Sequence, residues 1–131
     1  MIPRYFVVAE STHELQNPTS PEKLLRLGQL LGLGPGSRVL DIASGRGGPA
    51  LLLATEYGCS WHGVELSPDF HAVALARVVE AGLADRVIFE LGDGAAATFE
   101  PASYDAALCL GASFVYGSLA DTVDALVPAV R

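Results

Sequence analysis

Short apolar runs alternate with helix-like segments along most of this chain, and that alternation restricts the fold more than any other feature. Four runs have the length and composition of buried strands: residues 38–42, 60–65, 86–90 and 104–110. Helical patterns follow the first two runs, and a last helix opens at Ser118 and is disturbed by Pro128. Strands and helices in this order predict βαβ units with right-handed crossovers. We therefore expect an α/β domain built on a parallel sheet.

A helix precedes the first strand and divides the chain into two regions. Thr19 and Glu22 have the spacing of a capping box, and Pro21 falls in the first helical turn. Leucines at helical spacing mark the buried stripe of this helix, and glycines and a proline end it. We expect residues 1–35 to form a leading segment with a helix, and residues 36–131 to form the sheet domain.

The charge balance and the cysteines exclude several classes of partner. The 131 residues carry eight basic and fifteen acidic side chains, a net charge of −7. Because nucleic-acid binding needs cationic side chains that neutralise phosphates, we expect no DNA or RNA partner. Cys59 and Cys109 form neither a disulfide framework nor a CxxC metal pair. No apolar run has the length of a membrane span, so we expect a cytoplasmic protein with no membrane or metal partner.

A glycine-rich turn, residues 43–48, lies between the first strand and the next helix. Such a turn lets a ligand approach the backbone and points helix N–H groups at anionic atoms. Its spacing approximates the G-x-G-x-x-G turn of dinucleotide-binding domains and also a D-x-G-x-G-x-G turn. Asp41 favours the second pattern, because a carboxylate repels a pyrophosphate and attracts a cationic ligand. A turn that binds nothing, with Asp41 capping its amides, is the structural alternative.

Two further acidic residues follow the second and third strands. Glu65 can accept hydrogen bonds from a ribose diol, a device that NAD enzymes also use. Asp93 can accept from an adenine amine, and the N–H of Gly94 can donate to a ring nitrogen. A solvated acid at a strand end and a plain Asp-Gly turn are the corresponding structural alternatives. Because ligands bind beyond the carboxyl ends of parallel strands, these residues together predict an adenosine-containing ligand.

With these residues assembled, the chain resembles the class I methyltransferases that use S-adenosylmethionine (SAM). The segments that carry the resemblance are "RVLDIASGRGG", "WHGVELSP", "FELGDGAA" and "YDAALCLGAS", within residues 36–127. The opening "AESTHELQNPTSPEKLLRLGQLLGLGPG" is similar to a bacterial subgroup of small-molecule enzymes, the cyclopropane-fatty-acid-synthase-like methyltransferases. The resemblance implies a three-layer Rossmann-like sheet of order 3-2-1-4, a SAM cofactor and S-adenosylhomocysteine as product. It also implies that residues 1–35 cover the active site.

The resemblance also implies which residues bind the cofactor. The amides from Ala43 to Gly47 would hold the methionine moiety, and an alanine at position 43, where a glycine is usual, requires a negative φ. Glu65 would hold the ribose. Asp93 with Gly94 would hold the adenine. The cofactor-binding residues that we predict are Asp41, Ala43, Ser44, Gly45, Gly47, Glu65, Leu66, Asp93, Gly94, Leu110 and Gly111.

The sequence does not identify the methyl acceptor or a catalytic base. Candidates for the base are His13, Tyr5 and Asn17, because the resemblance places the leading segment near the active site. We expect His62 to be structural, His71 to lie on the exposed side of its helix, Trp61 to belong to the core, and Cys109 to be a small buried hydrophobe. The acidity of the chain favours a small-molecule acceptor over a nucleic acid.

The chain ends in what reads as the approach to a fifth strand, so we expect it to lack the C-terminal strands of the family. An unpaired edge at the fourth strand would then favour self-association. Two other functions stay open: an NAD(P)-binding oxidoreductase domain and a non-catalytic SAM-binding fragment. The oxidoreductase needs neither Asp41 nor Asp93, which makes it the weaker alternative.

Overall fold

The computed structural model describes residues 20–110 and 115–131. The helices among them are α2 (Pro21–Leu30), α3 (Gly48–Tyr57), α4 (Pro68–Glu80) and α5 (Leu119–Leu126). The strands are β1 (Arg38–Ile42), β2 (Ser60–Glu65), β3 (Val87–Leu91) and β4 (Ala106–Leu108). Two short 3₁₀ turns complete the described elements, η1 (Gly94–Ala96) and η3 (Val127–Ala129).

The strands form one parallel sheet in the order β3-β2-β1-β4, as the sequence and its resemblance predicted. In the pairing register Val39 lies opposite Trp61, Trp61 opposite Val87, and Val39 opposite Ala106 on the other side. From β1 the sheet extends through β2 and β3 in one direction and to β4 in the other. The strand order therefore reverses at β1, which is where sheets of this kind bind ligands.

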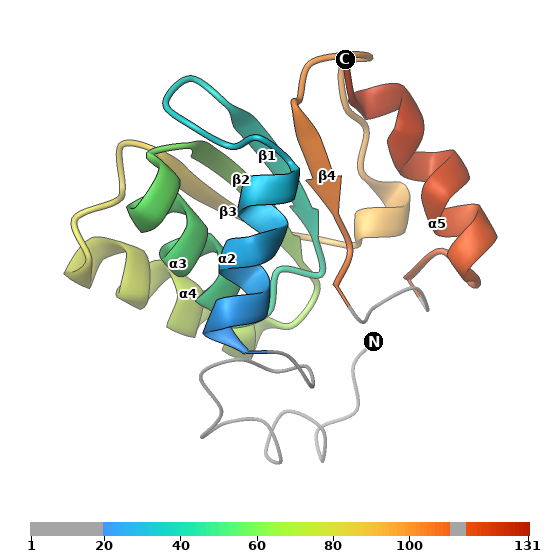
Figure 1. Ribbon diagram of the computed structural model, residues 1–131. Coiled ribbons are helices and arrows are strands. Elements are labelled where there is room, and N and C mark those ends of the chain that lie inside the picture. Colours follow the sequence, from blue (N-terminus) through green and yellow to red (C-terminus); the bar gives the residue numbers. More distant parts are fainter. Residues whose placement is uncertain (1–19, 111–114) are drawn as a thin grey trace.

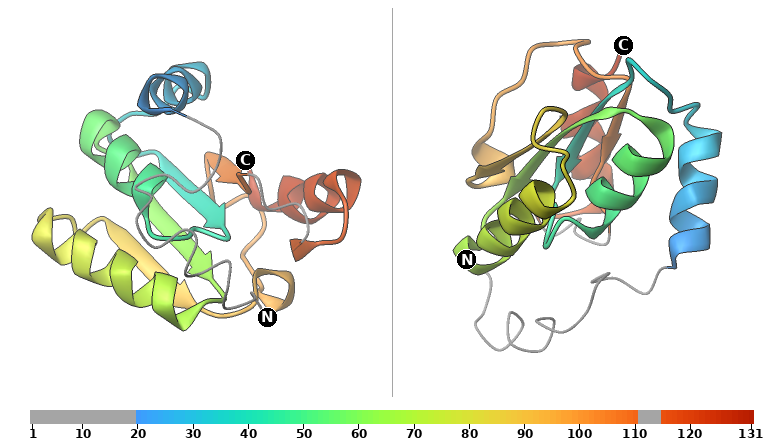
Figure 2. Two further views of the ribbon diagram at one scale, coloured as in Figure 1. Left: turned by 90° about the horizontal axis from the view of Figure 1, so that it is seen from below. Right: turned by 90° about the vertical axis from the view of Figure 1, so that its left-hand side faces the viewer.

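Helices cover both faces of the sheet, giving three layers (Figures 1 and 2). On one face α3 and α4 pack on the strands and α2 packs on α3, around a core that includes Leu53, Trp61 and Phe89. On the other face α5 and η3 cover a smaller core around Leu40, Ile42 and Leu126. β1 is nearly all buried because both faces are covered, whereas the edge strand β3 alternates, with Ile88 64% exposed.

Helix starts follow local capping chemistry. The hydroxyls of Ser20, Ser67 and Ser118 each accept a hydrogen bond from a backbone N–H three residues later. Ser20 is thus the cap of α2, where the sequence had suggested a capping box that begins at Thr19, a residue outside the described ranges. The observed cap still leaves Pro21 in the first turn of the helix.

The fourth strand is shorter than the sequence predicted. Its apolar run extends over 104–110, but regular pairing covers only Ala106–Leu108. Tyr104 instead forms an isolated parallel bridge with Val130, so the chain after η3 returns beside β4. The third strand is shifted by one residue, to Val87–Leu91. Within the described ranges no helix is long and apolar enough to cross a bilayer.

Candidate functional site

The loops after β1, β2 and β3 meet along the carboxyl edge of the sheet. Two backbone hydrogen bonds join neighbouring loops there: Ser44 N–H donates to Val64 O at 3.1 Å, and Gly92 N–H donates to Glu65 O at 2.9 Å. The end of β2 therefore fixes both the glycine turn after β1 and the turn after β3. This edge brings together the described residues that the sequence singled out, at the reversal of strand order.

The glycine turn alternates between left-handed and right-handed backbone. Ala43, Gly45 and Gly47 have φ values of 59°, 64° and 83°. The expectation of a negative φ at Ala43 is therefore wrong. The strained alanine is held in place because the residues on either side are fixed, Ile42 by strand pairing and Ser44 by its bond to Val64. Alternating backbone of this kind makes a concave array of N–H groups that suits an anionic group.

Three of the amides expected to hold the methionine moiety already have partners inside the protein. Ser44 N–H donates to Val64 O, and Gly47 N–H donates to Ser44 O. Gly45 N–H donates to the Glu65 side chain at 2.8 Å. The turn is thus rigid before any ligand binds.

Glu65 is a buried carboxylate, 2% exposed, that links two loops. Its Oε1 accepts from Gly45 N–H and its Oε2 from Ser67 N–H, both at 2.8 Å. Burial raises its pKa, against the opposing effect of these amides, the Leu66 amide and the nearby His71. A carboxylate has about four acceptor positions, so Glu65 retains capacity for further donors after binding these amides.

Asp41 is equally buried, 2% exposed, within β1. It pairs through its backbone with Gly63 on β2 and Leu108 on β4. The indole N–H of Trp61 donates to its Oδ2 at 3.3 Å. Burial raises the pKa of Asp41 to about 7, with Trp61 opposing the rise and Glu65 adding to it. The sequence predicted Trp61 only as a core residue, and strand alternation alone could have placed it on the face of Asp41.

The turn after β3 presents one exposed acid and one buried glycine. Asp93 Oδ1 accepts from Ala95 N–H at 2.9 Å, which leaves its other oxygen toward solvent. Gly94 is buried, and a Cβ there would lie 2.5 Å from Cγ2 of Ile42, so no larger residue fits without a shift. The hydroxyl of Tyr116 donates to Gly94 O at 3.2 Å. Sequence patterns alone did not indicate this Tyr116 contact.

The remaining predicted site residues have mixed positions. Ser44 is buried and its side chain packs toward Gly63, and its Oγ has no hydrogen-bond partner in the described part of the chain. Leu66 is 38% exposed, and Leu110 packs against the core that includes Leu53 and Trp61. Four predicted residues lie outside the described ranges: Tyr5, His13, Asn17 and Gly111.

Two histidines make specific contacts on β2 and α4. His62 reaches the Tyr104 hydroxyl at 2.8 Å and Glu90 at 3.1 Å. The prediction that His71 faces solvent is wrong, because its ring is half-buried and its Nε2 lies 3.1 Å from Phe89 O. That contact ties α4 to β3 next to Glu65. Among the described residues no group of His, Cys, Asp and Glu is arranged to hold a metal ion.

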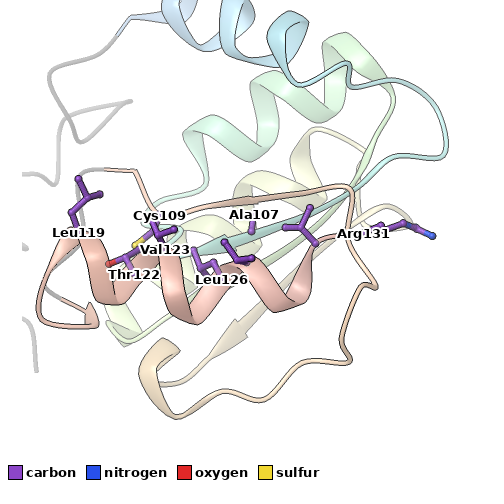
Figure 3. Close-up of a pocket in the computed structure, with 9 residues that line it drawn as sticks. Ala107, Cys109, Leu119, Thr122, Val123, Leu126 and Arg131 are labelled. Atoms are coloured by element: carbon purple, nitrogen blue, oxygen red, sulfur yellow. The ribbon is translucent and has the colours of Figure 1, made fainter.

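An apolar groove of about 500 Å³ lies between β4 and α5 (Figure 3). Ala107 and Cys109 form its floor, and Leu119, Val123 and Leu126 project into or border it from α5. Cys109 is half-buried and forms no disulfide among the described residues, and burial raises its pKa to about 11, with Asp41 adding to the rise. The groove follows the edge of β4 that has no neighbouring strand among the described residues.

Comparison with known proteins gives a consistent family. Residues 39–131 match the family model described as a methyltransferase domain. The chain is 35% identical over 130 residues to the uncharacterized protein YjhP of Escherichia coli (strain K12), covering 99% of this chain and 52% of YjhP.

Solved structures agree with that match. The SAM-dependent methyltransferase from Thiobacillus denitrificans, crystallised with S-adenosyl-L-homocysteine, is 38% identical with a TM-score of 0.92. Its counterpart from Geobacter sulfurreducens, also with S-adenosyl-L-homocysteine, is 40% identical with a TM-score of 0.91. In both cases the alignment covers 99% of this chain and 52% of the other. The chain spans about half the length of the relatives it matches.

Proposed function

Because the chain belongs to the methyltransferase-domain family and has the fold of its class I, SAM-dependent members, we propose that it binds SAM and serves methyl transfer to a small molecule. The observation that carries the proposal is the set of acids at the carboxyl edge of the sheet, Asp41, Glu65 and Asp93, around a rigid glycine turn. The family assignment favours this function over the NAD(P)-dependent oxidoreductase that the glycine spacing left open.

The donor and acceptor chemistry of the edge fits SAM. SAM carries an ammonium and a sulfonium, which a carboxylate attracts, and a ribose diol, which donates hydrogen bonds to a carboxylate. In the proposed complex Asp41 attracts the cationic methionine end, and Glu65 accepts from ribose hydroxyls with its remaining lone pairs. The exposed oxygen of Asp93 accepts from the adenine amine, and Gly94 gives the ring close access to the backbone. The cofactor itself supplies an activated methyl group.

The leading segment is proposed to complete the site. Helix α2 packs on α3, whose first residue, Gly48, is the last residue of the glycine turn. The contact is close: a Cβ on Gly28 would lie 2.3 Å from the Tyr57 ring. Residues 1–35 would then lie over the site, and His13, Tyr5 and Asn17 remain the proposed candidates for a base that assists the acceptor.

The net charge supports a small-molecule acceptor. At −7 the chain repels polyanions such as RNA over distances of about 10 Å at ordinary salt. Among the described residues neither cysteine is disulfide-bonded, as is usual in a reducing compartment, and we keep the cytoplasm as the proposed location.

Calorimetric titration with SAM, S-adenosylhomocysteine and NAD in parallel tests the cofactor. We expect micromolar binding of the two adenosyl compounds and none of NAD. Gly45→Val should abolish binding, because Gly45 has a φ of 64° and lies in the turn that we propose holds the cofactor. Gly82→Val is the matched control, since Gly82 has a φ of 70° but lies at the end of α4, with no atom within 4 Å of a Cβ. A folded wild-type chain that binds neither adenosyl compound would contradict the proposal.

The unpaired edge supports a second proposal, association of two copies through β4 and α5. Leu119 and Val123 on α5 and Val127 at the start of η3 are 72%, 50% and 62% exposed beside the groove, and a free strand edge is a template for pairing. Sedimentation over a range of concentrations should show dimers. Val123→Lys should dissociate them, and Val79→Lys, on the opposite helical layer and 71% exposed, should not. A monomer at every concentration would contradict this association.

A further inference from the structure

Trp61 and Asp41 form a buried pair beneath the glycine turn. Both side chains are 2% exposed, and the indole N–H lies 3.3 Å from Asp41 Oδ2. The indole nitrogen is only a donor, so it stabilises an acceptor and favours an ionised carboxylate over a protonated one. Within the described residues no cationic side chain pairs with Asp41. The indole is thus the side-chain donor that supports its charge.

The groups that face Asp41 come from both neighbouring strands. On β2, Trp61 donates to it and the Glu65 carboxylate opposes its charge. Beyond the end of β4, the charge of Asp41 adds to the rise in the pKa of the Cys109 thiol. Burial and Glu65 together raise the pKa of Asp41 to about 7, against the effect of Trp61. The carboxylate is therefore balanced between its two forms near neutral pH, and the indole bond favours the ionised form.

We infer that Trp61 is a positioning residue for cofactor binding: its indole N–H orients Asp41 and holds it in the charged form that attracts the cationic end of SAM. The inference rests on the proposed function. It assigns a role to a core tryptophan that is only 2% exposed. It also makes cofactor affinity depend on pH through one buried carboxylate.

The sign of the pH dependence follows from the charge that binds. Protonated Asp41 does not attract a cation, so SAM affinity should rise with pH, with a midpoint near 7. Trp61→Phe removes the donor and keeps an aromatic ring, which raises the pKa of Asp41 further. If that rise is about one unit, the ionised fraction at pH 7 falls from about one half to about one tenth, so affinity falls about five-fold. Near pH 9 the two proteins should bind SAM almost equally.

Calorimetric SAM titrations from pH 5.5 to 9 compare wild type with Trp61→Phe and Asp41→Asn. Trp61→Phe should shift the midpoint upward, and Asp41→Asn should bind weakly with no such midpoint. Val78→Ala removes volume from the same core without touching the carboxylate, so it should keep the wild-type midpoint. An equal loss at every pH in Trp61→Phe, or wild-type pH dependence in Asp41→Asn, would overturn the inference.

A ligand-free measurement separates this inference from the proposed function. Trp61 is the single tryptophan of the chain, so its fluorescence reports its own surroundings. Wild-type emission should change with a midpoint near pH 7, and the change should vanish in Asp41→Asn, which retains His62 and His71. If both proteins show the same emission profile, Trp61 does not sense Asp41 and the inference fails. If the profiles differ but no SAM binds at any pH, the pair exists, and both the proposed function and the cofactor role of Trp61 fail.

Discussion

Asparagine at position 41 should stabilise the protein increasingly as the pH rises. Asp41 is fully buried, and the ionised form that it adopts at high pH is costly there. Asp41→Asn keeps the shape of the side chain and an oxygen that can accept from Trp61, but it cannot ionise. The amide adds a buried donor, whose cost does not depend on pH. The difference between variant and wild type therefore isolates the ionisation of Asp41.

The magnitude follows from the shift in pKa. The pKa of the Asp41 carboxyl is about 7 in the folded protein and 3.8 when it is fully solvated, as in the unfolded chain. A group with a raised folded pKa contributes stability that is fully present below the unfolded pKa and is lost as the pH rises through the folded pKa. The shift is about three units, and each unit is worth 1.36 kcal/mol. Between pH 4 and pH 8 wild type should therefore lose about 3–4 kcal/mol relative to Asp41→Asn.

Urea denaturation of the ligand-free proteins, followed by circular dichroism at several pH values between 4 and 8, measures this difference. The free energies of unfolding of wild type and Asp41→Asn should diverge steadily over that range. Asp124→Asn is the control, because Asp124 is exposed on α5 and its loss should leave the wild-type pH dependence unchanged. Parallel curves for wild type and Asp41→Asn would refute the reasoning.

Three further substitutions test local features by the same denaturation assay. Glu65→Gln replaces one acceptor with a donor and should lower the free energy of unfolding by about 1.5–3 kcal/mol. Glu80→Gln, at the exposed end of α4, should change the free energy of unfolding by less than about 0.5 kcal/mol. Equal effects of the two substitutions would show that the bonds from Glu65 to the two loop amides do not stabilise the fold. Gly94→Ala puts a Cβ 2.5 Å from a methyl group of β1 and should cost about 1–3 kcal/mol. Gly92→Ala meets no atom within 4 Å and should cost less, so the reverse order would contradict the packing. Ala43→Gly relieves a φ of 59° and should raise the free energy of unfolding by up to about 1 kcal/mol, whereas a loss would show that the alanine is not strained.

Local signals predicted most of the sheet correctly. The run at Arg38–Ile42 is a strand with the expected bounds, because its apolar residues are followed within three positions by the first glycine of the turn. The run at 104–110 was overestimated, since only its middle pairs with β1 and Tyr104 instead forms a bridge with Val130. Strand length there is fixed by the neighbouring strand, and that information is not contained in the run itself.

The candidate site was predictable in its location and less so in its contacts. Residues after successive strands must meet at one edge, so the sequence could bring Glu65 and the glycine turn together. It could not show that Glu65 already binds two amides, because those bonds depend on loop conformations set by Val64 and Ser67. The wrong φ expected at Ala43 has a similar origin: tertiary bonds on either side override the preference of alanine. The residues that bind the cofactor remain predictions.

The strand register has a consequence for the order in which the molecule assembles. β1, β2 and β3 follow one another along the chain and are neighbours in the sheet, so that Val39 pairs with Trp61 and Trp61 with Val87. The partner of Val39 on the other side, Ala106, comes much later. Closing the short loops costs less entropy than closing the long one. A chain leaving the ribosome can therefore assemble residues 38–91 as a unit with the glycine turn and Glu65 in place, before β4 and α5 have been made. Amide hydrogen exchange should then be slowest in β1 and β2 and faster in β4.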